Sequence, residues 1–469
     1  MVLVCRASAS ADLGAHIFFR SQGGTREYRW KIIYYFDERR VRAQNCSYYA
    51  EPCPTFRTRQ WSFGAFGNRN GYPSFSGVHQ GRLWLGGIRG LPTTLFASTV
   101  GDFHNFRVGS AADSALHLTL ATDNQSGICW IYPARNLLVG TTESEWTLAA
   151  ADGAALSATN AAFVRQSSVG SENYAADGVE NTVLYVQRGG KRMREISYKL
   201  EADGFTSTDT SLLAEHLFRS GIREWVVQRG RSTRVWVLMQ DATLAVLTTN
   251  PEQQVTAWQR VQMPGRRVLH LAALPAANGA DDEVWFVCRN LISGFVSIER
   301  IVAGAPYADG LLQLEPNEQG VYQAPHLAGS TAWVLPDSPG REAVMVCIDE
   351  NGQFTHTAVT PFILGCPFRS ELQTMPYESE RSFNSVRQEG RVRLRLLESS
   401  PAFYYRATCA EDWEYADPQR QALVYPYTGS IRVSQMPIPR VGQGFALYVD
   451  SLQDFCLLSV SLEFDFHGK

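Results

Sequence analysis

A short apolar segment recurs five times between Trp61 and Val302, and this repeat restricts the possible folds more than any other feature of the sequence. The segments start 46 to 54 residues apart and are rich in β-branched and aromatic residues, which favour strands buried on both faces. They are Arg82–Gly87, Asn136–Thr141, Thr182–Arg188, Arg234–Met239 and Glu283–Arg289.

Each segment is followed, after a turn, by a second apolar segment that starts 9 to 12 residues later. The second segments are Thr94–Ala97, Glu145–Leu148, Met193–Ile196, Thr243–Leu247 and Phe295–Ile298. Further strands are expected at Ile128–Tyr132, Ile222–Val227, Val268–Ala272, Asn105–Val108, Phe163–Gln166 and Thr256–Arg260. A hairpin recurring about every 50 residues predicts an all-β fold with a β-propeller of about five to six blades.

Residues 1–60 predict a small β module in front of the propeller. His16–Phe19 is typical of a strand, and Trp30–Phe36 with Arg40–Ala43 is typical of a hairpin. The basic residues around its turn are Arg39, Arg40 and Arg42. They either contact phosphate or form the solvated face of a strand, and we favour the solvated face.

Proline residues become frequent after about residue 305 and indicate a domain boundary, so we expect a propeller at 61–305 and a platform domain at 306–469. Arg391–Leu397 alternates strictly between arginine and apolar residues, which predicts a strand with one face of each kind. The arginine face is either a phosphate contact or, as we favour, an exposed or subunit-facing surface. Closing strands at Phe445–Val449 and Cys456–Phe464 predict a β-sandwich-like domain of two sheets.

The bulk composition excludes some classes of function. The formal net charge of -3 gives no global basic field for wrapping nucleic acid, and no apolar run is long enough for a transmembrane helix. The nine cysteines match no zinc spacing, so we expect most of them to be buried structural thiols in a reducing compartment.

Common catalytic motifs are missing from the sequence. It contains no phosphate-binding glycine loop, no Gly-x-Ser-x-Gly and no His-Glu-x-x-His, and its histidines occur singly. His216, in a predicted helical turn at Ser211–Phe218 with Thr210 or Ser211 as N-cap, is expected to pack or to cap. We therefore expect no catalytic, cofactor-binding or metal-binding residue and no enzymatic activity. Propeller glycosidases use channel carboxylates, for which the candidates here would be Glu143, Glu145, Glu195 and Asp241.

Several sequence pieces resemble tail nozzle proteins of short-tailed phages, the tail tubular protein B or packaged-DNA stabilisation family. In the first half the pieces are Trp61-Ser-Phe-Gly-Ala-Phe66, Asn70-Gly-Tyr-Pro73, Gln80-Gly-Arg-Leu-Trp-Leu-Gly-Gly87, Phe96–Phe106, Leu120–Asn124, Leu184–Gly189 and Leu213–Phe218. In the second half they are Leu364–Pro376, Tyr427-Thr-Gly429 and Gln453–Leu458. The pieces follow the order of the family from about residue 12 onward.

The resemblance implies a propeller and a β-rich platform domain that assemble as a sixfold ring in the virion tail. Such a ring would lie below the portal and adaptor and conduct the genome, and its subunits would form in the host cytoplasm. DNA would pass through the lumen without specific binding, and no catalytic residue would be carried over. The alternatives are a propeller module that binds carbohydrate or protein, and a propeller hydrolase.

The chain departs from the family at its start. Members usually carry a long region before the small β module, whereas Met1 opens almost directly into that module here. We interpret the sequence either as a truncated or prophage-derived form or as one whose missing part lies on another chain. The resemblance therefore supports docking to the adaptor and closure of the ring less than it supports the fold.

Overall fold

The computed structural model describes most of the chain. The described residues are 2–4, 13–20, 27–37, 40–46, 61–109, 111–121, 126–151, 153–277, 281–302, 308–336, 343–358, 360–375, 388–408, 410–416, 423–438, 444–450 and 452–466. They divide into two compact units, Met1–Arg260 and Val261–Lys469, and each unit is considered by itself. The sequence-based boundaries near residues 60 and 305 remain predictions.

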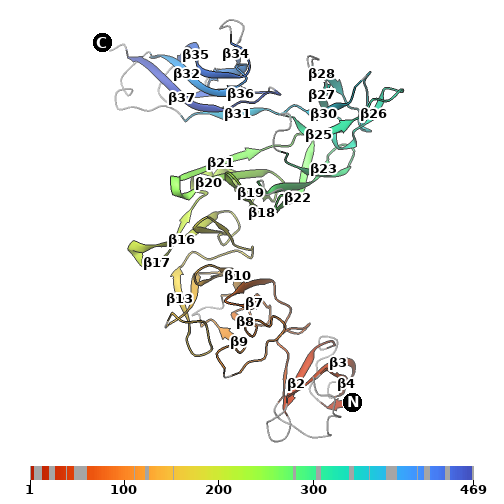
Figure 1. Cartoon of the computed structure of the whole chain (residues 1–469), viewed down its shortest axis with the longest axis vertical. Coiled ribbons are helices and arrows are strands. Elements are labelled where there is room, and N and C mark those ends of the chain that lie inside the picture. The colour runs from red at the N-terminus through yellow and green to blue at the C-terminus, as the bar shows by residue number, and fades with distance from the viewer. Residues whose placement is uncertain are drawn as a thin grey trace. The chain divides into compact units, whose positions relative to one another are not determined.

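The first unit contains four successive four-stranded sheets, and in each the strands lie side by side in sequence order (Figure 1). The first sheet consists of β6 (Phe75–His79), β7 (Arg82–Gly86), β8 (Thr94–Ala97) and β9 (Leu116–Thr119). The second consists of β10 (Ile128–Pro133), β11 (Leu137–Thr141), β12 (Glu145–Ala150) and β13 (Ala161–Ser167). The third sheet consists of β14 (Asp177–Val179), β15 (Thr182–Val186), β16 (Met193–Lys199) and β17 (Gly204–Asp209). The fourth consists of β18 (Ile222–Gln228), β19 (Thr233–Met239), β20 (Leu244–Asn250) and β21 (Val255–Val261). This strand order is that of propeller blades and confirms the predicted fold class.

A fifth sheet of the repeat belongs to the second unit. It has three strands, β22 (Arg266–Leu274), β23 (Glu283–Asn290) and β24 (Val296–Arg300). All five predicted hairpins therefore exist, and β11 and β15 are buried along their whole length, as their apolar sequences require.

Large aromatic side chains fill the space between neighbouring blades. Trp84 is fully buried and packs in one core with the β11 residues Leu137 and Val139, so it joins the first blade to the second. Trp130 of the second blade lies 5.5 Å from Tyr185 of the third, measured between ring centroids. The strand beside Trp130 carries Gly140, where a Cβ atom would come within 2.1 Å of the indole ring. Only glycine fits there.

Arg82 is buried in the first blade with 1% of its surface exposed. Its guanidinium donates hydrogen bonds only to backbone carbonyls, those of Ser98, Ala112, Asp113, Ser114 and Leu156, at 2.6 to 3.4 Å. Burial lowers the pKa of Arg82, and the charge of Asp113 opposes this shift. The arginine thus fixes the long connection from β8 to β9 onto the blade.

The N-terminal module is a five-stranded sheet in the order β1-β4-β3-β2-β5. Its strands are β1 (Val2–Val4), β2 (His16–Arg20), β3 (Glu27–Asp37), β4 (Arg40–Asn45) and β5 (Trp61–Phe63). The three strands predicted from the sequence are present, and one face of the sheet holds a small core that includes Ile17, Trp30 and Ile32.

The second unit continues with a four-stranded sheet and a two-stranded sheet that share one core. The larger sheet has the order β25 (Asp309–Leu314), β30 (Phe362–Cys366), β27 (Thr331–Pro336), β28 (Val344–Cys347), and the smaller one pairs β26 (Val321–Gln323) with β29 (Gln353–Thr355). Arg266 of β22 forms ion pairs with Glu299 of β24 and Asp309 of β25, so these charges tie the fifth blade to the larger sheet.

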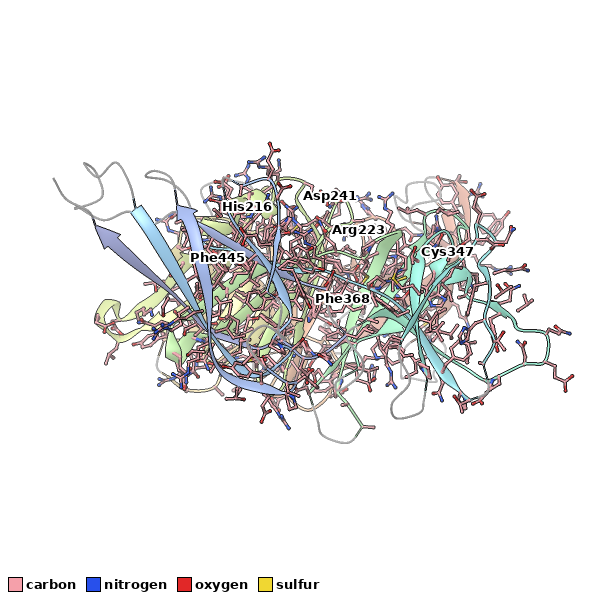
Figure 2. All side chains as sticks on the ribbon, turned by 90° about the horizontal axis from the view of Figure 1, so that it is seen from above. His216, Arg223, Asp241, Cys347, Phe368 and Phe445 are labelled. Carbon is pink, nitrogen blue, oxygen red and sulfur yellow. The ribbon has the colours of Figure 1, made fainter. Side chains whose placement is uncertain are left out.

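The C-terminal part is a sandwich of two sheets. One sheet has the order β31 (Ser370–Gln373), β36 (Phe445–Val449), β33 (Phe403–Ala407), β34 (Glu414–Ala416), and the other β35 (Tyr427–Ile438), β32 (Gln388–Ser399), β37 (Leu457–Phe466). Phe445, labelled in Figure 2, packs from the first sheet into a core that holds Leu394 and Ile431 of the second. The predicted arrangement of two packed sheets is confirmed for this part of the chain, whereas one platform domain over 306–469 remains a prediction.

One local prediction is wrong, and a second is confirmed only in part. Asn105–Val108 is not a strand, because the Asp102 and Asn105 side chains accept hydrogen bonds from the amides of His104 and Arg107 and form turns; the outer strand is β9. The predicted helical turn is the 3-10 segment η3 (Leu212–Leu217), and Ser211 at its N-cap position makes no side-chain capping bond. The other 3-10 segments among the described residues are η2 (Leu200–Ala202), η4 (Pro251–Gln253) and η5 (Pro325–Leu327).

The cysteines also differ from expectation. Of the six described cysteines, Cys129, Cys288 and Cys366 are buried, whereas Cys46, Cys347 and Cys456 are exposed. Burial raises the pKa of Cys129 and that of Cys288 to about 12, so these two thiols stay protonated. Among the described residues, no helix has the length and apolarity needed to cross a membrane.

Candidate functional site

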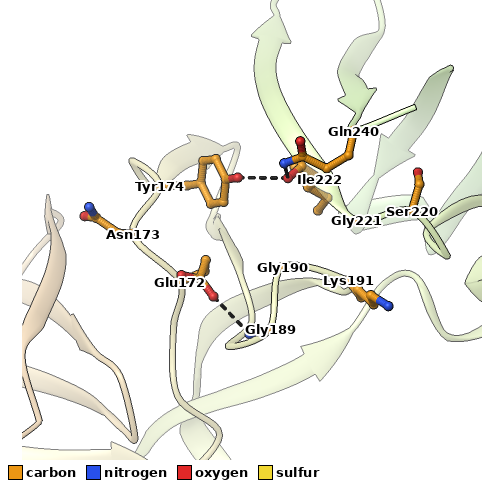
Figure 3. Close-up of a pocket in the computed structure, with 10 residues that line it drawn as sticks. All are labelled: Glu172, Asn173, Tyr174, Gly189, Gly190, Lys191, Ser220, Gly221, Ile222 and Gln240. Carbon is orange, nitrogen blue, oxygen red and sulfur yellow. Dashed lines mark hydrogen bonds between the residues drawn. The ribbon is translucent and has the colours of Figure 1, made fainter. Parts of the chain in front are cut away.

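A pocket of about 360 Å³ lies between loops of the third and fourth blades (Figure 3). Its walls come from the segment before β14, the β15–β16 turn, the start of β18 and the β19–β20 turn. The lining residues are Glu172, Asn173, Tyr174, Gly189, Gly190, Lys191, Ser220, Gly221, Ile222 and Gln240.

Hydrogen bonds fix the frame of the pocket. The Tyr174 hydroxyl and the Gln240 amide both donate to the carbonyl of Ile222, at 2.8 and 3.0 Å. The Gly189 amide donates to a carboxylate oxygen of Glu172 at 3.0 Å, and the Ile222 amide donates to the Gly190 carbonyl at 2.6 Å. The two blades are therefore joined directly beneath the pocket.

Two glycines shape one wall. Gly189 and Gly190 have φ values of 91° and 68°, a conformation that glycine adopts at little cost, and no atom lies within 4 Å of a Cβ built on either one. The turn therefore presents open backbone to the pocket, which leaves room for a ligand to approach.

The lining carries one carboxylate and one ammonium group among neutral polar groups. Glu172 is half-buried and Lys191 is exposed, while Asn173, Ser220 and Gln240 supply amides and a hydroxyl. Burial, and then the charge of Glu172, raises the pKa of Tyr174, so its phenol remains a hydrogen-bond donor near neutral pH. Such a lining suits a neutral polar ligand rich in hydroxyl or amide groups.

The pocket contains none of the four candidate carboxylates, although Asp241 follows the lining residue Gln240. Asp241 accepts hydrogen bonds from the amide and hydroxyl of Thr243, at 3.0 and 2.7 Å. Burial would raise the pKa of Asp241, but these bonds lower it. Asp241 is a turn-forming residue.

Glu143 and Glu145 stand at the turn between β11 and β12, but in different surroundings. Glu143 lies near the surface, 4.0 Å from Arg188. Glu145 is fully buried and accepts hydrogen bonds from the hydroxyls of Ser167 and Ser171. Burial raises the pKa of Glu145 above its ordinary value against these bonds. The structure does not pair the two carboxylates across a common cavity among the described residues.

Glu195 and His216 are also separate from the pocket. Glu195 is half-buried in the middle of β16, where burial raises its pKa and Lys199 opposes the shift. His216 is exposed on η3 (Figure 2), so of the two expected roles packing is wrong, while its place in the last turn of η3 leaves capping as a prediction. No group of three or more metal-ligating side chains occurs within the described part of the chain.

The basic clusters predicted from the sequence are partly described. Arg40 forms an ion pair of 2.7 Å with Asp37 and Arg42 is exposed, which fits a solvated strand face; Arg39 lies outside the described residues. In β32, Val392, Leu394 and Leu396 are buried while Arg395 is exposed, so the predicted alternation of this strand is confirmed.

The chain is similar in fold to several solved structures with repeated β-sheets. Dihydro-heme d1 dehydrogenase NirN matches at 11% identity over 76% of this chain and 75% of NirN, with a TM-score of 0.32. The WD40 domain of SCAP from fission yeast matches at 9% identity over 81% and 95%, with a TM-score of 0.31. The Pseudomonas aeruginosa periplasmic gluconolactonase PpgL matches at 12% identity over 74% and 96%, with a TM-score of 0.29. No protein-family profile and no curated protein matches the sequence.

The expectation that the chain has no enzymatic activity is corrected. Two of the three similar structures, the dehydrogenase and the gluconolactonase, are enzymes by name. Identities of 11% and 12% with TM-scores of 0.32 and 0.29 do not transfer a reaction or a catalytic residue to this chain. The chain is a β-propeller-type module.

Proposed function

We propose that the chain is a structural subunit of a phage tail, part of a sixfold nozzle ring that retains and conducts the genome. One observation carries the proposal: the pieces that resemble the nozzle family lie in the same order along folded elements of both compact units. Gln80–Gly87 forms the turn into β7 and that strand, and Leu364–Pro376 includes most of β30 and all of β31. Tyr427–Gly429 begins β35.

The proposed role is steric and electrostatic. A conduit lets DNA pass most easily when its lumen is neutral or weakly acidic, because phosphate contacts with basic residues would add salt-dependent affinity. The formal net charge of -3 is compatible with such a lumen. The tail adaptor would be a further partner, with the subunit made in the host cytoplasm and then built into the virion tail.

Quantitative mass spectrometry of gradient-purified particles tests this proposal. Peptides of this chain should be present at about half the copy number of the portal, as expected for a sixfold ring beneath a twelvefold portal. Absence from intact particles, with the protein abundant elsewhere in the same cells, would exclude the virion role.

A second candidate function is a binding module for carbohydrate or protein, which the pocket between the third and fourth blades favours. Its hydroxyl and amide groups match the hydrogen-bonding needs of a sugar or a peptide backbone. A glycan array with Tyr174→Ala as the control tests the carbohydrate case. A signal that disappears in this variant supports binding in the pocket, and equal signals in both proteins contradict it.

A further inference from the structure

Within the described part of the chain, the N-terminal sheet of β1 to β5 has one covered face and one open face. Ile17, Trp30 and Ile32 lie in the small core on the covered face. Because side chains alternate along a strand, the positions between these residues point to the opposite face. That face carries His16 and Phe18 of β2, Arg29, Lys31, Tyr34 and Phe36 of β3, and Arg42 and Gln44 of β4, which are all exposed or half-buried. We call these eight residues the open sheet face.

Two cations stand in the middle of the open sheet face. Lys31 lies directly opposite His16 of β2, and Arg42 lies directly opposite Tyr34. Both cationic side chains are exposed, and neither forms an ion pair with a residue that the structure describes. Burial, and then the charges of Arg29 and Lys31, lower the pKa of His16, so the charge around this histidine is positive.

The carboxylate residues of β3 lie at the two ends of the strand, each beside a basic residue. Asp37 forms an ion pair of 2.7 Å with Arg40, and Glu27 at the other end pairs in register with Arg20. Residues 38–39 of the turn after β3 lie outside the described residues. Arg40 therefore belongs to a neutralised edge of the sheet, whereas the middle of the open sheet face keeps its positive charge.

Aromatic rings stand beside these cations. Tyr34 and Phe36 are 56% and 49% exposed, and their rings meet edge to face with centroids 4.9 Å apart. Ile33, at the bulge before Tyr34, is 44% exposed. The solvent face of an antiparallel sheet is usually polar, whereas β3 is apolar on both faces from Ile32 to Phe36. Large apolar side chains that are exposed together indicate a binding surface.

We propose that the open sheet face binds single-stranded nucleic acid. Proteins that bind single strands combine cations for the phosphates with exposed rings on which bases stack, and this face carries both. Arg29 already interacts within the chain, so the phosphate contacts fall to Lys31 and Arg42. Tyr34 and Phe36 supply the rings. Stacking and phosphate contacts do not distinguish bases, so DNA and RNA strands of any sequence should bind.

The pairing of rings with cations favours single strands over other anionic partners. The bases of a duplex already stack on one another, so a duplex would use the cations but not the rings. An acidic peptide would likewise match Lys31 and Arg42 but would bring no flat group for Tyr34 and Phe36. The surface is local, so it is compatible with a formal net charge of -3, and it does not depend on the proposed nozzle role.

Fluorescence anisotropy of the full-length chain tests the proposal, with labelled oligodeoxythymidylate and oligouridylate of about 20 nucleotides as probes. Two phosphate contacts on a single strand predict that raising the salt from about 50 to about 500 mM weakens binding about 25-fold. Lys31→Gln/Arg42→Gln should weaken binding at least about tenfold at the lower salt and remove most of the salt dependence. Arg165→Gln/Arg219→Gln removes the same charge at exposed sites elsewhere in the first unit and should bind as the wild type does.

Removing the rings is the decisive step, because it separates stacking from attraction between charges. Tyr34→Ala/Phe36→Ala should weaken binding at least about fivefold and leave the salt dependence unchanged. Tyr198→Ala is the control, since Tyr198 is also 49% exposed and also meets a phenylalanine ring edge to face. Circular dichroism checks that each variant folds. If the alanine variant does not fold, Tyr34→Leu/Phe36→Leu replaces it, because leucine keeps the apolar bulk without a flat ring.

Three results would overturn the proposal. They are a wild-type chain that binds neither probe at the lower salt, a folded ring variant that binds as the wild type does, and a duplex of the same length that binds as tightly as the single strand. Binding of polyglutamate that is lost in Lys31→Gln/Arg42→Gln, without binding of either probe, would assign the face to an acidic peptide instead. Particle mass spectrometry tests the virion role separately, so failure of either idea can be told from failure of the other.

Discussion

Among the described residues two arginines are buried, one in each compact unit, and they are stabilised in different ways. Arg82 in the first blade contacts only backbone carbonyls, whereas Arg266 in the fifth contacts the carboxylates of Glu299 and Asp309. Their pKa values move in opposite directions. Burial lowers the pKa of Arg82; at Arg266 burial acts the same way, but Asp309 and then Glu299 outweigh it and raise the pKa.

The difference shows what each charge holds in place. The carbonyls around Arg82 belong mostly to the connection between β8 and β9, so this arginine organises backbone that has no regular partner of its own. The carboxylates around Arg266 lie on two strands, so this arginine joins two sheets that are already formed. Backbone carbonyls cannot be removed by mutation, whereas carboxylates can, and this makes the comparison testable.

The largest effect is expected for Arg82→Met. The substitution leaves several buried carbonyls without a donor and should lower the free energy of unfolding by about 3–5 kcal/mol. Urea unfolding followed by circular dichroism measures the loss. Arg89→Met, at an exposed position of the same blade, should stay within about 0.5 kcal/mol of the wild type. A loss below about 1 kcal/mol at Arg82 would show that water replaces the guanidinium.

Arg266→Met is expected to cost about 3 kcal/mol, because it leaves two partly buried carboxylates without their partner. The triple variant Arg266→Met/Glu299→Leu/Asp309→Leu should recover most of this stability, since apolar groups often replace a buried ion cluster at little cost. The same urea measurement applies. If the triple variant is as unstable as the single one, the stability that Arg266 contributes cannot be recovered by removing its carboxylate partners. Arg266 would then not differ from Arg82 in this respect.

Two glycines with positive φ extend the comparison to the turns. At Gly87 (φ 70°) an added Cβ atom would lie 2.0 Å from the Ser74 hydroxyl, whereas at Gly189 (φ 91°) in the pocket it would have no neighbour within 4 Å. Gly87→Ala should therefore cost about 2 kcal/mol or more, and Gly189→Ala only about 1 kcal/mol of backbone strain. Thermal unfolding of the two variants side by side checks the order, and equal losses would contradict it.

The smallest effect concerns the pH dependence set by Glu145. Its folded-state pKa is raised above the ordinary 4.5, so its contribution to stability is complete below that pH and decreases as the pH rises through the raised pKa. Between about pH 4.5 and neutrality, the wild type should lose stability relative to Glu145→Gln. Unfolding midpoints of both proteins across this range measure the trend. A trend of opposite sign would mean that the serine hydrogen bonds dominate over burial.

The repeat could be predicted from the sequence because the second strand of each blade is largely apolar. Among the blade strands that the sequence did not indicate, β6, β14 and β17 contain glycine, serine or aspartate and are only partly buried, so their composition resembles that of loops. The opposite error occurs at Asn105–Val108, where the sequence predicts a strand but the chain forms turns. The side chains of Asp102 and Asn105 there bind backbone amides that a strand would need.

The pocket could not be predicted in this way. Its residues come from four separate loops, and the packing of two blades brings them together. The glycine pair at Gly189 and Gly190 indicates only a turn, and nothing in the local sequence marks Glu172, Tyr174 or Gln240 as its neighbours. The alternation in β32 was predictable, because a period of two in seven residues is itself the pattern of a half-buried strand.

The strand order of the two parts also determines when each can form during synthesis. A blade is complete once about 50 residues have left the ribosome, because each of its strands pairs with the one just made. In the sandwich, β32 lies between β35 and β37, so its sheet must wait for the last strand, Leu457–Phe466. A nascent chain would therefore carry finished blades well before it carries the complete sheet around β32.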